Sequence, residues 1–263
     1  MENKDLTKQE NKDLELFFDA SNDLGDGFEE TTNNDLQPNF LKVAQKEVAD
    51  PNEAAYIEGV AAGDFYDTIS KQSMGQKLKA VVLHFNTTYV EWGKDLGEYR
   101  GQFKLNEFKA LKNLTPHESK IGTMMTPEGT SIVETKNYYL YLPDYPEKGI
   151  VLFCLSSSGA KLSKMWEPKF QLIKKNGKIA SRYFGVWEIE TQIAKSEKHK
   201  KSWYAIGDKS KVNADFVGFV PTDHQANVMN LRSTIKEWID NDIKINYSNN
   251  SEEMFNSELE NEI

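Results

Sequence analysis

Lysine, arginine and aromatic residues are interleaved through residues 161–211, and this mixture is the part of the sequence best suited to binding chemistry. The window holds thirteen Lys/Arg and five Asp/Glu, a net charge of +8. Single-stranded nucleic acid is held by cations that follow its phosphates and by rings that stack on its bases. The residues that we expect to contact nucleic acid in this window are Lys161, Lys164, Trp166, Arg182, Phe184, Trp187, Lys200, Lys201 and Trp203.

A second and shorter run of the same kind lies between residues 89 and 104. Its candidate contacts are Tyr89, Trp92, Arg100 and Lys104. Most tryptophans and phenylalanines in strands are core residues, and most lysines form an ordinary solvated surface. For any single residue the pattern therefore leaves both interpretations open, and the prediction depends on the combination of charge and rings.

Catalytic chemistry is much less evident in the sequence. The four histidines are widely separated and fit no zinc motif, the SSSG at 156–159 is not G-x-S-x-G, and no glycine-rich phosphate loop is present. Glu188 and Glu190 alternate along one predicted strand, where a solvated face is a commoner explanation than an acid–base pair. We therefore predict that the protein is not an enzyme and uses no metal or other cofactor.

Charge is distributed unevenly along the chain. Of the net charge of −9, residues 1–40 contribute eleven Asp/Glu against three lysines, and residues 245–263 contribute five glutamates and no lysine or arginine. A basic body thus lies between two acidic ends. We predict an acidic, mostly disordered arm over residues 1–36, a nucleic-acid-binding domain over 37–245, and an acidic disordered tail over 246–263.

The tail has a specific predicted role. A flexible polyanion tethered to a basic groove competes with nucleic acid at an effective concentration on the order of millimolar, and its apolar residues fit a pocket on a partner. The candidate partner-binding residues are Glu252, Glu253, Phe255, Glu258, Glu260, Glu262 and Ile263. A tail that only keeps the protein in solution is the alternative.

Hydrophobic patterning indicates the elements that carry these residues. Strands are expected at 63–69, 77–92, 181–193, 201–207 and 211–222, with one more ending near 103 and two around the PDYPEKG turn within 137–158. Helices are expected within 36–50, at 156–176 with a kink or a fresh start at Pro168, and at 224–243. Because strands and helices do not alternate regularly, we predict a mainly β fold with inserted helices (α+β), arranged as an antiparallel β-barrel.

Several segments follow one another in an order that recurs in a known family. They begin with AGDFYDTI and the strand ending in YVEW, where Gly63, Asp64, Thr68, Tyr89, Glu91 and Trp92 match the family pattern. LFCLSSSGAKLSKMWEPKF, FGVWEIETQ and KSWYAIG follow in the same order. In these segments the sequence resembles phage-encoded single-stranded DNA-binding proteins, and the resemblance covers residues 38–240. It implies an OB-like antiparallel β-barrel and a role in DNA replication or recombination.

The expected function is therefore sequence-tolerant binding of single-stranded DNA for a phage, in the host cytoplasm. The tail would recruit replication or recombination proteins. The sequence does not decide between DNA and RNA as the ligand. It also leaves open whether the protein forms a homo-oligomer. We expect no membrane partner, because the sequence has no long apolar run and no secretory signal, and the single Cys154 predicts a buried thiol in a reducing compartment. The alternatives are a virion-associated or protein-interaction structural protein that binds no nucleic acid, and a nuclease.

Overall fold

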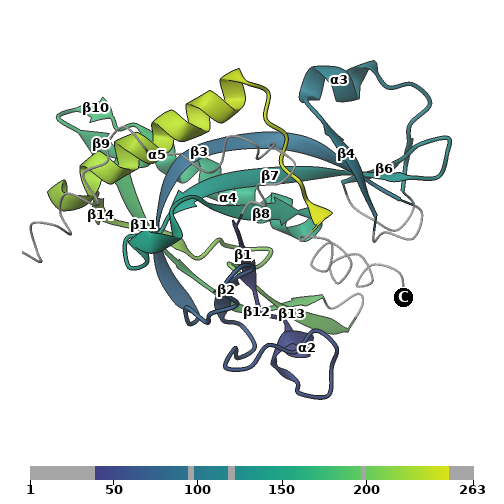
Figure 1. Ribbon diagram of the computed structural model, residues 1–263, viewed down its shortest axis with the longest axis horizontal. Coiled ribbons are helices and arrows are strands. Elements are labelled where there is room, and N and C mark those ends of the chain that lie inside the picture. Colours follow the sequence, from purple (N-terminus) through teal and green to yellow (C-terminus); the bar gives the residue numbers. More distant parts are fainter. Residues whose placement is uncertain (1–38, 94–97, 118–121, 197–199, 249–263) are drawn as a thin grey trace, which may run out of the picture. The chain divides into compact units, whose positions relative to one another are not determined.

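The computed structural model describes residues 39–93, 98–117, 122–196 and 200–248, and a curled ten-stranded sheet dominates this part of the chain (Figure 1). The main path through the sheet runs β14–β11–β3–β7–β8–β1–β2, while β4 pairs with β3, and β5 and β6 extend from β7. The sheet strands are β1 Asn39–Val43, β2 Phe65–Asp67, β3 Lys77–Trp92, β4 Tyr99–Phe103, β5 Thr115–Pro116, β6 Thr123–Met125, β7 Ser131–Tyr141, β8 Val151–Ser156, β11 Gly185–Glu190 and β14 Ala214–Phe219.

Smaller elements connect and cover these strands. Two hairpins lie outside the main sheet, one of β9 with β10 and one of β12 with β13. The remaining elements are α2 Lys46–Ala49, α3 Leu105–Ala110, η1 Pro146–Lys148, α4 Ser157–Leu172, β9 Lys174–Lys175, β10 Lys178–Ile179, η2 Arg182–Phe184, β12 Gln192–Ser196, β13 Lys201–Ala205 and α5 Thr222–Asp240. A mainly β fold with inserted helices is therefore confirmed. None of the described helices is long and apolar enough to cross a membrane.

The long strand β3 organises the sheet. Its first residues pair with β11 at Lys77–Val81, and its last residues pair with β4 at Tyr89–Trp92. Strands rise about 3.3 Å per residue, so the eight steps from Val81 to Tyr89 hold these two ends about 26 Å apart. β11, which belongs to the basic–aromatic run at 161–211, and the run at 89–104 consequently lie at opposite ends of β3.

Both faces of the sheet are covered, and each face has its own hydrophobic core. Helix α4 places Leu162, Trp166 and Phe170 in the core of one face. Helix α5 places Val228 and Ile235 in the core of the other face. Helix α4 continues through Pro168 as one element, so the expected fresh start there is wrong.

The first strand differs from the sequence expectation in two ways. Phe40 and Leu41 were predicted to lie in a short helix, but they are in β1, and only Lys46–Ala49 is helical. Phe40 belongs to one core and Leu41 to the other, as expected of a strand that is buried on both faces. β1 also runs parallel to β8, so the sheet is not purely antiparallel.

The G-D-x-x-D-T segment anchors β1 and β2. An ideal Cβ on Gly63, whose φ is +91°, would lie 2.6 Å from the ring of Tyr204, so only glycine fits there without a shift. Asp64 Oδ2 accepts hydrogen bonds from the Ser73 hydroxyl at 2.6 Å and from the Ala61 amide at 3.1 Å. Thr68 Oγ1 accepts the Phe40 amide at 3.0 Å. These motif residues therefore act in the framework of the fold.

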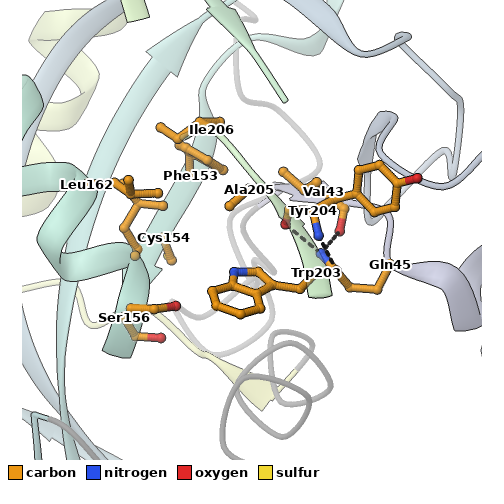
Figure 2. Close-up of a pocket in the computed structure, with 13 residues that line it drawn as sticks. Val43, Gln45, Phe153, Cys154, Ser156, Leu162, Trp203, Tyr204, Ala205 and Ile206 are labelled. Carbon is orange, nitrogen blue, oxygen red and sulfur yellow. Dashed lines mark hydrogen bonds between the residues drawn. The ribbon is translucent and has the colours of Figure 1, made fainter. Parts of the chain in front are cut away.

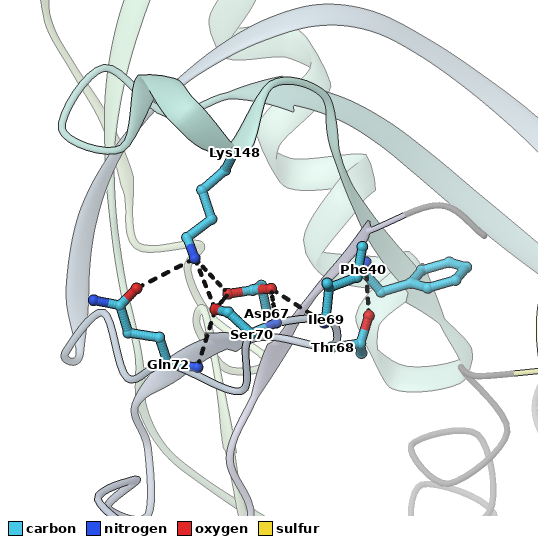
Figure 3. A network of polar contacts seen from close by, with 7 residues as sticks. All are labelled: Phe40, Asp67, Thr68, Ile69, Ser70, Gln72 and Lys148. Carbon is cyan, nitrogen blue, oxygen red and sulfur yellow. Dashed lines mark hydrogen bonds and ion pairs between the residues drawn. The ribbon is translucent and has the colours of Figure 1, made fainter. Parts of the chain in front are cut away.

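Asp67 of the same segment is the centre of a buried ion pair (Figure 3). Lys148 Nζ donates to Asp67 Oδ2 at 2.9 Å and to Ser70 Oγ at 2.7 Å, and only 9% of the Lys148 side chain is exposed. Burial alone would raise the pKa of Asp67, but hydrogen bonds from Ser70 and Lys148 outweigh burial and lower it. The pair ties the turn after β2 to η1.

The folded part of the chain reaches beyond the predicted domain end at residue 245. The Tyr247 ring is fully buried beside Phe40, with 6.0 Å between ring centroids, and its hydroxyl lies 3.0 Å from Thr88 Oγ1. Burial raises the pKa of Tyr247 well above its ordinary value, so the phenol stays neutral. Residues 246–248, predicted as the start of the tail, therefore belong to the packed body.

Candidate nucleic-acid interface

A surface of exposed rings and cations lies at the β14 end of the sheet. β14 is the last strand on its side of the sheet path, and its pairing with β11 is interrupted at Val217. Phe216 and Phe219 are 38% and 37% exposed, and Phe184 of η2 is 37% exposed. We define the β14 patch as Lys175, Tyr183, Phe184, Phe216, Phe219 and Arg232.

The members of the β14 patch contact one another in a continuous series. Lys175 Nζ lies 5.1 Å from the ring centroid of Phe219 and 5.9 Å from that of Phe184. Phe219 packs on Phe216 with 5.3 Å between centroids. These distances are in the range of cation–π and edge-to-face contacts, so one lysine bridges two exposed rings.

The series continues onto α5. Phe184 packs on Tyr183 with 4.6 Å between centroids, and the guanidinium carbon of Arg232 lies 3.5 Å from the Tyr183 centroid.

Burial lowers the pKa of His84, and the positive charges of Arg182 and Arg232 lower it further. The imidazole is therefore largely neutral at pH 7.

More lysines extend the patch along helix α4. Lys161 and Lys164 are exposed, and exposed Pro168, Gln171 and Leu172 follow on the same side of the helix at three- and four-residue spacing. With 16 residues, α4 is about 24 Å long. The hairpin after it adds exposed Lys174 and Lys178. Exposed lysines thus lie at the start of α4 and in the hairpin that follows its end, with an uncharged stretch of helix between them. We call Lys161, Lys164, Lys174 and Lys178 the α4 stripe.

A pocket lies near the start of that stripe (Figure 2). We call it the Trp203 pocket; its volume is about 110 Å³. It is lined by Val43, Gln45, Phe153, Cys154, Leu155, Ser156, Ser158, Gly159, Leu162, Trp203, Tyr204, Ala205 and Ile206. The pocket thus joins β1, β8, the first turns of α4 and β13.

Three of the tryptophans predicted to stack on bases are core residues. Trp92, Trp166 and Trp187 are at most 1% exposed. Trp166 packs between Tyr138 and Trp187, with centroid distances of 4.7 and 6.0 Å. No face of these three rings is open to a base, so they do not belong to the candidate interface.

Three predicted cations have carboxylate partners. Arg100 pairs with Glu98 at 2.7 Å, and Lys104 pairs with Asp242 at 2.5 Å. Arg182 makes two hydrogen bonds of 2.8 Å to Glu167.

Aromatic rings also pack against the Arg182 guanidinium. Its guanidinium lies 4.4 Å from the centroid of Phe170 and 5.2 Å from that of Phe85. Tyr89, at the far end of β3, is stacked on Phe108 at 3.9 Å. These residues support local structure, and the run at 89–104 is not brought near the β14 patch.

The other predicted residues lie at three places. Phe184 is in the β14 patch, and Lys161 and Lys164 are on the α4 stripe. Trp203 of β13 lines the pocket, Lys201 begins that strand, and Lys200 directly precedes it. The tail residues Glu252 to Ile263 lie outside the described residues.

Sequence reasoning selected only Phe184 of the β14 patch. Lys175 and Tyr183 lie in the basic window but were not selected, and Phe216, Phe219 and Arg232 were missed. A weak signal was present, because ADFVGF places Phe216, Val217 and Phe219 around a glycine without strict alternation. Such a pattern is typical of a bulged strand at the edge of a sheet, but it does not say which strand lies at the edge.

Potential catalytic groups have structural partners. Glu188 and Glu190 both pair with Lys77, at 2.9 and 3.6 Å, as expected of a solvated strand face. Within the described ranges, no three His, Cys, Asp or Glu residues are grouped so that they could hold a metal ion.

The fold and the surface define a β-rich α+β protein that carries an aromatic and basic face. The chain belongs to the Pam3 phage gp34-like protein family, whose model matches residues 8–228. It is therefore a phage protein, and the acidic C-terminal tail lies beyond the matched region. No curated protein and no solved structure matches the chain.

Proposed function

We propose that the protein binds single-stranded nucleic acid, with little sequence preference, on the β14 patch and the α4 stripe. The observation that carries this proposal is Lys175 poised over the exposed rings of Phe184 and Phe219. Stacking on aromatic rings accepts any base, because every base has a π face, and cations beside the rings attract the phosphates. A role in phage DNA replication or recombination, in the host cytoplasm, is part of the proposal.

The exposed rings support a single strand as the ligand in this proposal. A duplex stacks its bases internally and presents only phosphates and groove edges, so exposed phenylalanines gain nothing from it. Exposed Lys161 and Lys164 would supply further contacts to phosphates of the strand. An OB-like identity of the fold belongs to the same proposal, although the sheet has ten strands where an OB-fold has five.

The tail enters the proposal as a competitor. Five glutamates follow the anchored Tyr247 within sixteen residues, and Lys161 and Lys164 are exposed on α4. A tethered polyanion would occupy cationic positions when nucleic acid is absent and would yield them to a longer strand. Phe255 and Ile263 would then be available to recruit replication or recombination proteins.

A second candidate function is supported by the edge position of β14. Phe216, Val217 and Phe219 form an exposed apolar surface at the end of the sheet path, which is also typical of protein docking. On this reading the protein is a virion-associated or protein-interaction component. The two functions differ in their dependence on salt, because phosphate contacts release counterions and apolar contacts do not.

The test is a fluorescence-anisotropy titration of a labelled mixed-sequence single strand, with the matched duplex as the control. The full chain is compared with residues 1–248, a truncation that retains the buried Tyr247 anchor. We expect strand-selective binding whose affinity falls steeply with salt, and tighter binding by the truncated protein. The proposed function would be contradicted if the single strand and the duplex bound equally well, or if neither bound. Unchanged affinity after truncation would contradict only the role of the tail.

A further inference from the structure

We infer that the Trp203 pocket binds one unpaired nucleobase, with the attached phosphate directed toward the lysines of α4 and β13. For a base that belongs to a bound strand, the inference rests on the proposed function and adds a second contact to that strand. The same chemistry is offered by a free mononucleotide, so the pocket can be tested without any strand.

The size of the pocket fits one ring system. Its volume of about 110 Å³ is several times the ~10–15 Å³ that a single water requires. It is well below the ~300–1,000 Å³ of sites that enclose whole drug-sized ligands. A base therefore fits inside, while its sugar and phosphate must stay at the mouth.

The pocket exists because two neighbouring strands separate. β1 pairs with β8 from Asn39 to Leu41, and it pairs with β2 as far as Val43. The last residues of β8, Cys154 to Ser156, keep their pairing with β7 and line the space that opens on the other side. β13 forms another wall of this space and is not paired with β8.

The wall formed by β13 is held in place by a side-chain clamp. Gln45 Nε2 donates to the Tyr204 carbonyl at 2.9 Å, and the Tyr204 amide donates to Gln45 Oε1 at 2.9 Å, as the dashed lines in Figure 2 show. The Tyr204 ring is packed against Gly63. Because Tyr204 is fixed on both sides, its neighbour Trp203 is presented to the pocket without the cost of ordering a loop.

The lining supplies both kinds of contact that a base needs. The indole of Trp203 projects toward Ser156 across the pocket, with Phe153, Leu162 and Ile206 farther along (Figure 2). An indole gives a base a stacking surface, and the hydroxyls of Ser156 and Ser158 can donate to or accept from its polar edge. These hydroxyls suit any base, consistent with sequence-tolerant binding.

The charges around the pocket favour a phosphate. Lys201 precedes Trp203 by two residues on β13, so both side chains lie on the same face of the strand. Lys161 is exposed one turn after the pocket residue Ser158 on α4. No aspartate or glutamate is among the thirteen lining residues, so nothing in the wall repels an anion.

The experiment is saturation-transfer NMR on the full chain with AMP and adenosine as probes and inorganic phosphate as a competitor. We expect AMP to receive saturation, most strongly at its base protons. Trp203→Leu should weaken AMP binding at least about fivefold, the lower limit for loss of one base stack. Lys201→Ala should weaken the binding of AMP and leave that of adenosine unchanged. Unchanged melting temperatures establish that both variants fold.

Two results would overturn the inference. One is the absence of saturation transfer to AMP from the wild-type chain, and the other is an unchanged AMP affinity in Trp203→Leu. The Phe184→Ala/Phe219→Ala variant separates this site from the proposed function, because it alters the β14 patch and leaves the pocket intact. If AMP binds to the pocket while oligonucleotides bind nowhere, the proposed function fails and the pocket assignment stands.

Discussion

Two neighbouring sets of rings in this protein have opposite exposures. Trp187 and Phe216 lie 6.1 Å apart between ring centroids, yet Trp187 is 1% exposed and Phe216 is 38% exposed. The first belongs to the core under α4 with Trp166 and Phe170, and the second belongs to the β14 patch. Trp187 is covered by Trp166 and Phe170 of α4, whereas Phe216 lies on β14, which ends this side of the sheet path.

The same contrast holds for lysines. Lys148 is 9% exposed in its side chain and is paired with Asp67, whereas Lys175 is exposed and lies over two rings. Residue type therefore does not separate support from binding in this protein. What packs around each side chain does, since Lys148 and Asp67 are buried although β2 also ends the sheet path, and each prediction below tests that division.

The largest effect is expected inside the core. Trp166→Ala should lower the free energy of unfolding by about 3–5 kcal/mol, because it removes a fully buried ring and leaves a cavity. Phe216→Ala, the matched change at an exposed ring, should cost less than about 2 kcal/mol. Urea denaturation measures the free energy of unfolding of both variants. Equal losses would contradict the division between core and patch.

The buried cation is expected to matter nearly as much. Lys148→Ala leaves the Asp67 carboxylate buried without its counter-charge, at a cost of about 3–5 kcal/mol in free energy of unfolding. The control is Lys79→Ala, whose partner Asp144 is 3.7 Å away on the surface, and its cost should be at most about 1 kcal/mol.

Acid should remove the contribution of Asp67. The pKa of Asp67 is lower in the folded protein than its ordinary value of 3.8, so its stabilising effect is complete above that pH and is lost as the pH falls through the lower folded value. The stability advantage of wild type over Asp67→Asn should therefore shrink in denaturation experiments carried out below pH 3.8. A constant difference across this range would show that the charge of Asp67 is not what stabilises the turn.

The smallest effect concerns salt. Lys175→Ala should reduce the slope of log affinity against log salt by about 0.7, the value for one phosphate contact with a single strand. Arg100→Ala, which removes a cation already paired with Glu98, should leave the slope unchanged. A titration series over several salt concentrations measures both slopes. An equal change in the two slopes would show that the strand does not bind specifically at Lys175.

The framework was largely predictable from the sequence, and the site was not. β3 spans Lys77–Trp92 as the β-type run predicts, and α4 and α5 lie where the three- and four-residue spacing places them. These elements depend on local patterns. The parallel pairing of β1 with β8 joins residues more than a hundred positions apart, and no local pattern encodes it.

Exposure of rings depends on the same long-range pairing. The basic composition of 161–211 selected Phe184, Lys161, Lys164 and Trp203, which lie on the surface or at the pocket, but it equally selected Trp166 and Trp187, which are core. Alternation in a strand says that some of its rings are buried, and the order of strands in the sheet decides which. That order was unknown from the sequence.

The most direct test of the account is the affinity of Phe184→Ala/Phe219→Ala for a labelled single strand, measured by anisotropy beside wild type. Removal of these rings should weaken binding by about 1–3 kcal/mol per stacked base. Tyr56→Ala, which removes a ring of similar exposure far from the patch in sequence, should bind as wild type does. If the double variant keeps its melting temperature and binds the strand as tightly as wild type, the β14 patch is not the nucleic-acid interface.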